Sequence, residues 1–358
     1  MTDYDSTGVR CTMLRGGTSR GLYFEPADLP ADPAERDDLL LRLMGTPDPR
    51  QIDGLGGATS LTSKVAVISR SEHPSADVDY LFLQLGVDEP TVSTGQNCGN
   101  ILAGVGPFAV ERGLVPAGDR ETSVRIRMVN SDSVAVATFA TPSGRVEYRG
   151  AVAISGVPGT AAPVTLAFTD TEGSATGRLL PTGNIRDAID GIEVTCVDNG
   201  MPVVLAMAGE FGLTGYESPE RLAVDQPLLG RIDAFRRKAA QLMGLGDEPG
   251  PIPKTVLLAP PRAGGRVSTR SFIPVRPHTS IGVLAAISVV TGMLLPGAVG
   301  HELAAEWPAG SSQVDVEHPS GHLLVDVLVD GRTVLRSGVV RTARKLFDGT
   351  AYPRGETK

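Results

Sequence analysis

The four residues Asn97-Cys98-Gly99-Asn100 are the strongest candidates for chemistry in this chain. They open an apolar run, residues 100–112 (NILAGVGPFAVER), whose composition predicts a buried helix. A cysteine at a helix start has its thiolate stabilised by the exposed backbone N–H groups and the helix dipole. The same N–H groups favour a bound carboxylate, and Gly99 leaves room above them. The alternative is a buried structural cysteine, which is more typical of the interior of a helix or strand.

Two glycine-rich segments could bind an anion through free N–H groups and hydroxyls. The first, residues 15–21 (RGGTSRG), includes Thr18 and Ser19, and its spacing is not that of a Walker A loop. An ordinary glycine-rich turn is the alternative. The second, residues 51–63, leads into a predicted strand. Its candidate binding residues are Gly56, Gly57 and Ser63.

Lys64 lies where the second segment meets the strand. A lysine that faces a partly dry pocket can act as a base, and a protonated one can bind a carboxylate. A solvent-exposed side chain is the ordinary interpretation of a lysine at such a boundary. Taken alone, the residue pattern therefore favours the surface interpretation for Lys64.

Two further turns are candidates for binding. Asn199 and Gly200 stand in the segment 197–202 (VDNGMP), where one strand ends and another begins. A simple hairpin and a ligand-binding turn are equally good interpretations of that pattern. The run His278-Thr279-Ser280 precedes a second apolar segment and is an anion site on the same grounds as the first. Salt-bridge partners for an anionic ligand are Arg15 and Arg276, with structural roles as the alternative.

Two central helices must position these residues. Residues 100–112 and 281–295 are apolar on nearly every face, so other structure must enclose each of them. They begin about half a chain length apart, which predicts two similar halves, residues 1–185 and 186–339. Each half is expected to be a curled, mostly antiparallel sheet around one helix, with residues 340–358 returning to the first half.

Hydrophobic periodicity predicts further elements and an α/β fold with many short strands. We expect helices at residues 33–44 and 225–245. Asn97 and either Thr279 or Ser280 are the expected N-caps of the two central helices. Strands are expected at residues 65–69, 80–85, 124–128, 133–139, 145–148, 194–197, 203–207, 256–258 and 323–328.

The composition narrows the class of protein. The chain is 41% hydrophobic and 21% charged, so it can bury a core, and its net charge of −8 disfavours a nucleic-acid partner. Three cysteines without a CxxC pair form neither a disulfide framework nor a zinc site and suit a reducing cytoplasm. The N-terminal segment lacks an apolar core, which disfavours secretion. No apolar run reaches about 20 residues, which disfavours a membrane span. Surface positions are expected for His73, His301, His318 and His322.

Four motifs in combination resemble the PrpF-type isomerases and 4-oxalomesaconate tautomerases. They are RGGTSRGLYF (15–24), QIDGLGGATSLTSKVAV (51–67), NCGNILAGVGPFA (97–109) and VDNGMP (197–202). The resemblance runs from about residue 9 to about residue 350. It implies the diaminopimelate-epimerase-like fold, with a site in the cleft between the halves. It also implies catalysis without a metal or an organic cofactor.

The resemblance implies roles for particular residues. Epimerases of this fold use a cysteine at the start of each central helix; Cys98 matches the first, and no cysteine stands near Thr279 and Ser280. The branch that this chain resembles pairs the cysteine with the lysine of a TSK motif, which is Lys64 here. Cys196, just before the VDNGMP turn, is expected to be structural. Substrate contacts are expected from Arg15, Thr18, Ser19, Gly56, Gly57, Ser63, Asn97, Gly99, Asn100, Asn199, Gly200, Arg276, His278, Thr279 and Ser280.

The reaction expected from the resemblance is a 1,3-proton shift on a small unsaturated di- or tricarboxylate. Lys64 and Cys98 would exchange the proton, and which of them abstracts it stays open. The sequence LTSKVAV is most similar to the oxalomesaconate branch, with 2-methylaconitate and 3-methylitaconate as alternative substrates. An amino-acid racemase and a carboxylate-binding accessory protein are rival hypotheses, and the empty second cysteine position counts against the racemase. No membrane partner is expected, and a homodimer is the assembly considered.

Overall fold

The computed structural model describes residues 7–95, 97–246, 250, 252–304, 307 and 312–355. Their contacts divide the chain into two compact units. Unit 1 comprises the residues up to Leu166 and those from Arg341 onward, and unit 2 comprises Ala167–Val340. The domain boundary expected between residues 185 and 186 stays a prediction. No helix among the described residues is long and apolar enough to cross a membrane.

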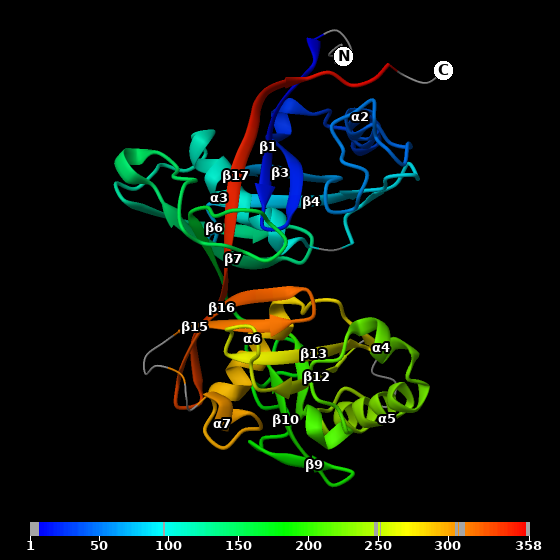
Figure 1. Cartoon of the computed structure of the whole chain (residues 1–358). Helices are drawn as coiled ribbons and strands as arrows, with labels where there is room; N and C mark the ends of the chain where they lie inside the picture. The colour runs from blue at the N-terminus through cyan, green and yellow to red at the C-terminus, as the bar shows by residue number, and fades with distance from the viewer. Residues whose placement is uncertain are drawn as a thin grey trace. The chain divides into compact units, whose positions relative to one another are not determined.

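Unit 1 is built around the helix α3 (Gly99–Glu111), which lies among its strands in Figure 1. The strands β1 and β2 form a hairpin, β3 joins β2 in parallel, and β4 returns antiparallel. After α3, β6 joins β4 in parallel and β7 pairs with β6 antiparallel. The bounds are β1 Val9–Gly16, β2 Ser19–Phe24, η1 Pro26–Asp28, α2 Pro33–Met44, β3 Lys64–Arg70, β4 Val78–Leu85, β5 Val92–Ser93, β6 Glu121–Met128, β7 Ser133–Ala140, η2 Pro142–Gly144 and β8 Pro163–Phe168.

Unit 2 repeats this order around the helix α6 (Val283–Leu294). The strands β10 and β11 form a hairpin, β12 joins in parallel, β13 returns, and β15 and β16 follow the helix as β6 and β7 do. The bounds are β9 Asp187–Ile189, β10 Ile192–Asp198, β11 Pro202–Met207, η3 Ala208–Phe211, α4 Pro219–Val224, α5 Gln226–Leu242, β12 Lys254–Ala259, β13 Val267–Ile273, β14 Arg276–Pro277, α7 His301–Ala304, β15 Gln313–His318 and β16 Gly321–Asp330.

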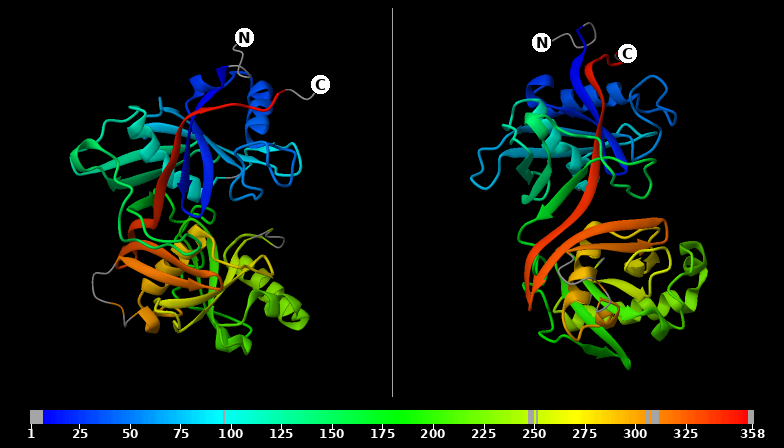
Figure 2. Two further views of the ribbon diagram at one scale, coloured as in Figure 1. Left: turned by 45° about the horizontal axis from the view of Figure 1, so that its top comes forward. Right: turned by 60° about the vertical axis from the view of Figure 1, so that its left-hand side comes forward.

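The predicted class, α/β with two similar halves each curled around a central helix, is confirmed. The long strand β17 (Thr333–Ala351) begins in unit 2 and ends in unit 1, where it pairs antiparallel with β1. Both views in Figure 2 show β1 and the end of β17 side by side. At that end Val9 pairs with Ala351. The return of residues 340–358 as a whole to the first half stays a prediction.

Close packing explains the small residues of the two central helices. A side chain at Gly104 of α3 would collide with the Tyr23 hydroxyl, and one at Gly106 would lie 2.6 Å from the Phe139 ring. Gly292 of α6 likewise leaves room for Leu205. Because both helices are buried on nearly every face, their polar starts are the parts free to meet a ligand.

Three local predictions are wrong. Residues 145–148 are not a strand, because the chain turns at η2 and residue 147 makes an isolated hydrogen bond to Ala140 instead of a ladder. The N-cap of α3 is Cys98 and not Asn97, whose amide donates to the Ser131 hydroxyl. The N-cap of α6 is Gly282 and neither Thr279 nor Ser280, because the chain first makes a separate turn in which Ser280 N–H donates to His278 Nδ1.

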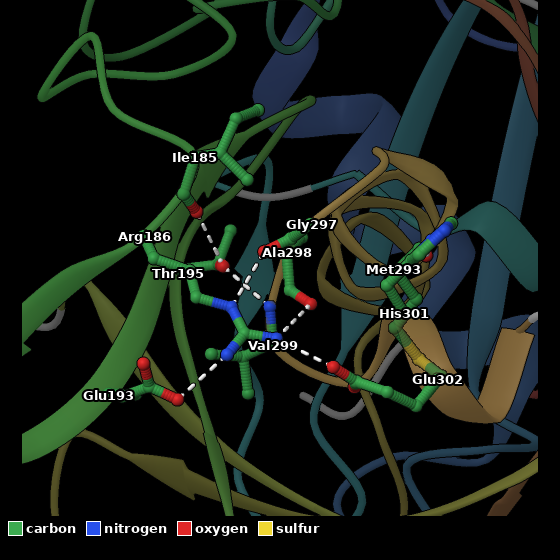
Figure 3. Close-up of polar contacts among 10 residues, drawn as sticks. All are labelled: Ile185, Arg186, Glu193, Thr195, Met293, Gly297, Ala298, Val299, His301 and Glu302. Atoms are coloured by element: carbon green, nitrogen blue, oxygen red, sulfur yellow. Dashed lines mark hydrogen bonds and ion pairs between the residues drawn. The ribbon is translucent and has the colours of Figure 1, made fainter.

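Arg186 and Thr195 fasten the turn that follows α6 to the sheet of unit 2 (Figure 3). The Arg186 guanidinium donates to the carbonyls of Gly297 and Ala298 and forms ion pairs with two glutamates. The fully buried Thr195 hydroxyl donates to the Ile185 carbonyl at 2.7 Å and accepts the Val299 N–H at 2.9 Å. One hydroxyl therefore joins two segments that lie more than a hundred residues apart in sequence.

Replacing that hydroxyl tests its contribution. Thr195→Val keeps the shape but leaves a buried carbonyl and a buried N–H unpaired, so we expect the free energy of unfolding to fall by about 1–3 kcal/mol. Urea denaturation followed by circular dichroism measures the change. The control is Thr333→Val at the exposed start of β17, expected to change stability by less than about 0.5 kcal/mol. Equal stability of the two variants would contradict the role given to Thr195.

Candidate active site

The start of α3 presents Cys98 at a solvent-accessible position. Cys98 is a free, half-buried thiol and the N-cap residue, with extended backbone angles. A Cβ added to Gly99 would meet nothing within 4 Å, so space is open above the first turn of the helix. The helix start therefore offers a thiol and unpaired backbone N–H groups to a carboxylate at one place.

Two tyrosines support Cys98 from the sheet. The Tyr80 hydroxyl donates to the Cys98 carbonyl at 3.4 Å, and the Tyr23 hydroxyl donates to the Ile101 carbonyl at 2.6 Å. Both side chains are fully buried. Burial raises the pKa of each phenol well above its usual value, and the negative charge of a nearby Cys98 thiolate raises it further. Both hydroxyls therefore stay neutral donors. The sequence did not single out either tyrosine, because the alternation of apolar residues along a strand accounts for a buried tyrosine equally well.

Lys64 is not a surface lysine. It is the first residue of β3, is 7% exposed, and donates from Nζ to Gln84 Oε1 at 2.5 Å. The same Nζ lies 5.2 Å from the centre of the Phe82 ring, which neighbours the Tyr80 ring on β4. A row of contacts through Phe82 and Tyr80 therefore runs from the Lys64 amine to the Cys98 carbonyl within unit 1.

Gln84 is a positioning residue that sequence analysis missed. Its amide Nε2 donates to the carbonyls of Ser60 and Ser63, in the loop before β3, while its Oε1 accepts from Lys64. A glutamine inside an alternating strand carries no signal of this role; only the register of β3 and β4, which pairs Lys64 with Gln84, brings the two together.

The first glycine-rich turn packs directly on the start of α3. Side chains at Gly16 or Gly17 would collide with Asn100. The Asn100 amide Nδ2 donates to the Thr18 hydroxyl at 3.0 Å, and Asn100 Oδ1 accepts the Thr18 N–H at 3.4 Å. Ser19 is 1% exposed, and its hydroxyl has no partner among the described residues. The turn therefore fixes the helix start and leaves one buried hydroxyl available.

The second glycine-rich loop is held by Gln51. Its Oε1 accepts the Ala58 N–H and the Ser63 hydroxyl, both at 2.9 Å. Gly56 lies so close to this amide that a side chain there would collide with it. Ser63 is fully buried and also donates to Thr59, so its hydroxyl maintains the loop that delivers Lys64. Gly57 leaves room for Arg20 and Thr62.

Arg15 makes hydrogen bonds that hold the last strand. Its guanidinium donates to the carbonyls of Gly17 and Thr342 and to the Thr342 hydroxyl. With Thr18 and Ser19 it also borders a cavity that Lys64 and Cys98 do not line. Asn97 stays beside the helix start, bonded to Ser131.

In unit 2, the buried residue Asn199 makes several hydrogen bonds. Its amide donates to the hydroxyls of Thr291 and Ser337 and accepts from Thr171 and Ser337, and its N–H donates to Ser288. Any contact between its side chain and a substrate requires one of these partners to be exchanged, so that contact stays a prediction. Gly200, with φ +92°, faces Leu284 in the first turn of α6.

The segment before α6 gathers polar groups in unit 2. Ser280 pairs with His318 Nε2 at 3.3 Å, while Arg276 and Thr279 are exposed. His73 is exposed as predicted, whereas His301, His318 and His322 are half-buried and hydrogen-bonded.

Lys254 is a further residue that sequence analysis missed. It is the first residue of β12, as Lys64 is of β3, and its Nζ lies 3.7 Å from a Cβ added to Gly282 at the start of α6. Burial lowers the pKa of its amine. Only the repeat of strand order between the units reveals the correspondence between Lys254 and Lys64.

The chemical groups of the candidate site are a thiol, an amine, phenols and backbone N–H donors. Such groups transfer protons and bind carboxylates. Within the part of the chain that is described, no three His, Cys, Asp or Glu side chains gather as metal ligands would.

The three thiols differ in reactivity. Burial raises the pKa of Cys11 and of Cys196 to about 12, so both stay protonated thiols in a sealed environment, while Cys98 is accessible. We expect Ellman's reagent, at about pH 8, to modify one thiol per native chain and none in Cys98→Ser. Unfolding in denaturant should release the other two. Rapid reaction of more than one thiol in the native protein would refute this assignment.

Comparison with known proteins places this chain in a family. The profile described as PrpF protein matches residues 7–354. The (4E)-oxalomesaconate Delta-isomerase of Novosphingobium sp. (strain KA1) is 52% identical over 98% of this chain and 99% of its own length. The 4-oxalomesaconate tautomerase of Pseudomonas putida (strain KT2440) is 53% identical over 96% of this chain and 95% of its own length.

A solved structure shares the fold. The crystal structure of methylitaconate-delta-isomerase superposes with a TM-score of 0.85 at 33% sequence identity, covering 96% of this chain and 95% of the other. Profile, relatives and structure agree over nearly the whole length. The chain belongs to the PrpF family and is an isomerase.

Proposed function

We propose that this chain catalyses the keto–enol tautomerisation of 4-oxalomesaconate, with Lys64 and Cys98 as the proton-transferring pair. The observation that carries the substrate is the identity of 52% and 53% to two relatives named for oxalomesaconate, against 33% to the methylitaconate isomerase structure. The geometry of unit 1 supports the pair, because Lys64 is buried and lies at one end of the row of contacts that reaches the Cys98 carbonyl.

The chemistry requires one acidic C–H bond. In the keto form a CH₂ group lies between the ketone and the carbon–carbon double bond, so loss of one proton gives a dienolate whose charge rests largely on the ketone oxygen. Returning the proton to that oxygen gives the enol, and returning it to the far alkene carbon moves the double bond. Both reactions named for the two relatives therefore share one intermediate, which needs a base, an acid and oxyanion donors.

The residues of unit 1 fit these requirements. The amine and the thiol supply the base and the acid, in an order that the test below decides. Backbone N–H groups at Gly99 and Asn100 are suited to a carboxylate or to the developing oxyanion. Contacts from Arg15, Thr18, Ser19, Gly200, Arg276, His278, Thr279 and Ser280 stay predictions.

Loss of either proton carrier should abolish turnover. We expect Lys64→Met and Cys98→Ser each to lower kcat by about 10²–10⁴-fold, the range for general acid–base catalysis. Proton NMR in heavy water follows both product formation and deuterium entry at the CH₂ carbon. The variant that still exchanges deuterium without forming product retains the base.

The control for Lys64→Met is Lys238→Met, on the exposed side of α5 and in a surface ion pair with Asp190. It should turn over like the original chain. If folded Lys64→Met and Cys98→Ser variants both kept full turnover, the proposed pair would be wrong. If turnover required 3-methylitaconate or 2-methylaconitate in place of 4-oxalomesaconate, the pair would stand and the substrate would change.

Gln84 offers a test of whether Lys64 titrates during the reaction. Gln84→Glu places a carboxylate against Nζ and favours the charged ammonium, so we expect the pH–rate profile to move upward by about one pH unit. The control is Gln226→Glu at the exposed start of α5. A profile that stays in place while kcat falls would show that the substitution acts only through the loop that Gln84 holds.

We also propose a cytoplasmic setting and no nucleic-acid partner. Cys11, Cys98 and Cys196 are all free thiols, which suits a reducing compartment. The net charge of −8 opposes binding to a polyanionic backbone. A homodimer stays a prediction.

A further inference from the structure

Three arginines form a row across neighbouring strands of unit 1. Arg15 of β1 lies opposite Arg20 of β2 and opposite Arg344 of β17. Directly opposed residues in antiparallel strands project from the same face, so like charges at these positions destabilise a sheet. Arg15 shows the effect: burial lowers its pKa, and the neighbouring charge of Arg344 lowers it further. A bound anion would offset the repulsion within such a row.

The row borders a cavity of about 800 Å³ within unit 1. Arg149 and Lys345 also line this cavity, which we call the arginine pocket, together with the residues Thr18 and Ser19. Neither Lys64 nor Cys98 is among the described residues that line it. The pocket is therefore a concave, cationic surface apart from the proton-transferring pair.

The positive charge of the arginine pocket is largely uncompensated. Lys345 pairs with Glu111 at 3.0 Å, but among the described residues no carboxylate pairs with Arg20, Arg149 or Arg344. Arg15 donates to backbone carbonyls and a threonine and to no acid.

Three buried polar atoms of the pocket residues also lack partners within the described chain. They are Nε of Arg20, Oγ of Ser19 and the hydroxyl of Tyr148, and Ser19 is 1% exposed. Buried donors in native proteins almost always have a hydrogen-bond partner, so these three have bonding capacity that a bound ligand or water would satisfy.

We propose that the arginine pocket binds a compact polycarboxylate, a small anion with two or three carboxylate groups. Planar guanidinium groups bind carboxylates through paired N–H donors, and several of them match several carboxylates on one small molecule. This inference goes beyond the proposed function, because it assigns Arg15, Thr18 and Ser19, whose contact with the reaction's substrate stays a prediction, to a second site, and because it is measured without turnover. The row Arg20–Arg15–Arg344 would then be stabilised by the bound anion.

Thr18 connects the arginine pocket to the start of α3. Its hydroxyl accepts from the Asn100 amide, while its methyl group lies 3.2 Å from a Cβ added to Gly156 in the pocket wall. An anion bound beside Thr18 and Ser19 would hold the glycine-rich turn against the residues that follow Cys98. Occupancy of the pocket thereby supports the geometry of the helix start.

Citrate is the probe, and isothermal titration calorimetry on the full chain is the measurement. We expect Arg149→Gln and Arg344→Gln, both at exposed positions that should not disturb folding, each to weaken citrate binding about tenfold, the effect of losing one charge-assisted contact. Arg10→Gln, on β1 but outside the pocket, is the matched control and should bind like the original chain. The Lys64→Met/Cys98→Ser double variant should also bind citrate unchanged.

Three results would overturn the inference. Citrate binding no weaker in Arg149→Gln and Arg344→Gln than in Arg10→Gln would remove the pocket from the interaction. Loss of citrate binding in the Lys64→Met/Cys98→Ser variant would assign the anion to the reaction's own site. Inorganic phosphate binding as tightly as citrate would exclude a preference for polycarboxylates. None of these outcomes depends on turnover, so failure here leaves the proposed reaction standing.

Discussion

Burial of an apolar helix on nearly every face is the constraint from which the rest of this structure follows. A helix such as α3 can be stable in water only when strands enclose it, and enclosure leaves its polar end groups to be satisfied. The C-terminal turns of both central helices are closed by local hydrogen bonds, as when Leu295 N–H bonds to Gly292. At the start of α3 a Cβ added to Gly99 would meet nothing within 4 Å, so space is open beside its N-terminal N–H groups. The start of the central helix is therefore electropositive in each unit, whichever side chains lie beside it.

The residues at the starts of α3 and α6 differ. At α3 the N-cap is a thiol and the lysine that opens β3 is bound to Gln84. At α6 the N-cap is Gly282, and Lys254 at the start of β12 lies near it without a second thiol. A repeated framework thus carries the proposed proton-transferring pair in unit 1, whereas the described residues at the matching place in unit 2 are a lysine and hydroxyl groups. This asymmetry agrees with isomerases that shift one proton along a carbon skeleton and opposes a symmetric two-thiol racemisation.

Some of this could be predicted from the sequence because the signals were local. Uniform hydrophobicity located both central helices, and the Asn-Cys-Gly-Asn run placed Cys98 within one residue of the helix start. Other features depend on register, which a single sequence does not specify. Gln84 meets Lys64, and Arg15 meets Arg20 and Arg344, only because particular residues face each other across strands. The strand expected at residues 145–148 failed for a related reason: its composition suits a strand, but no neighbour pairs with it in a ladder.

The path of β17 has a consequence for how this protein is made. Unit 2 is continuous in sequence, so all of its residues are available for folding once Val340 has left the ribosome. Unit 1 is split, because β1 at the beginning of the chain waits for its partner strand until Ala351 has been added. During translation the first unit must therefore hold an open sheet edge beside β1 while the second unit completes itself. Unit 1, whose first strand is synthesised first, can complete its sheet only after all of unit 2 has been synthesised.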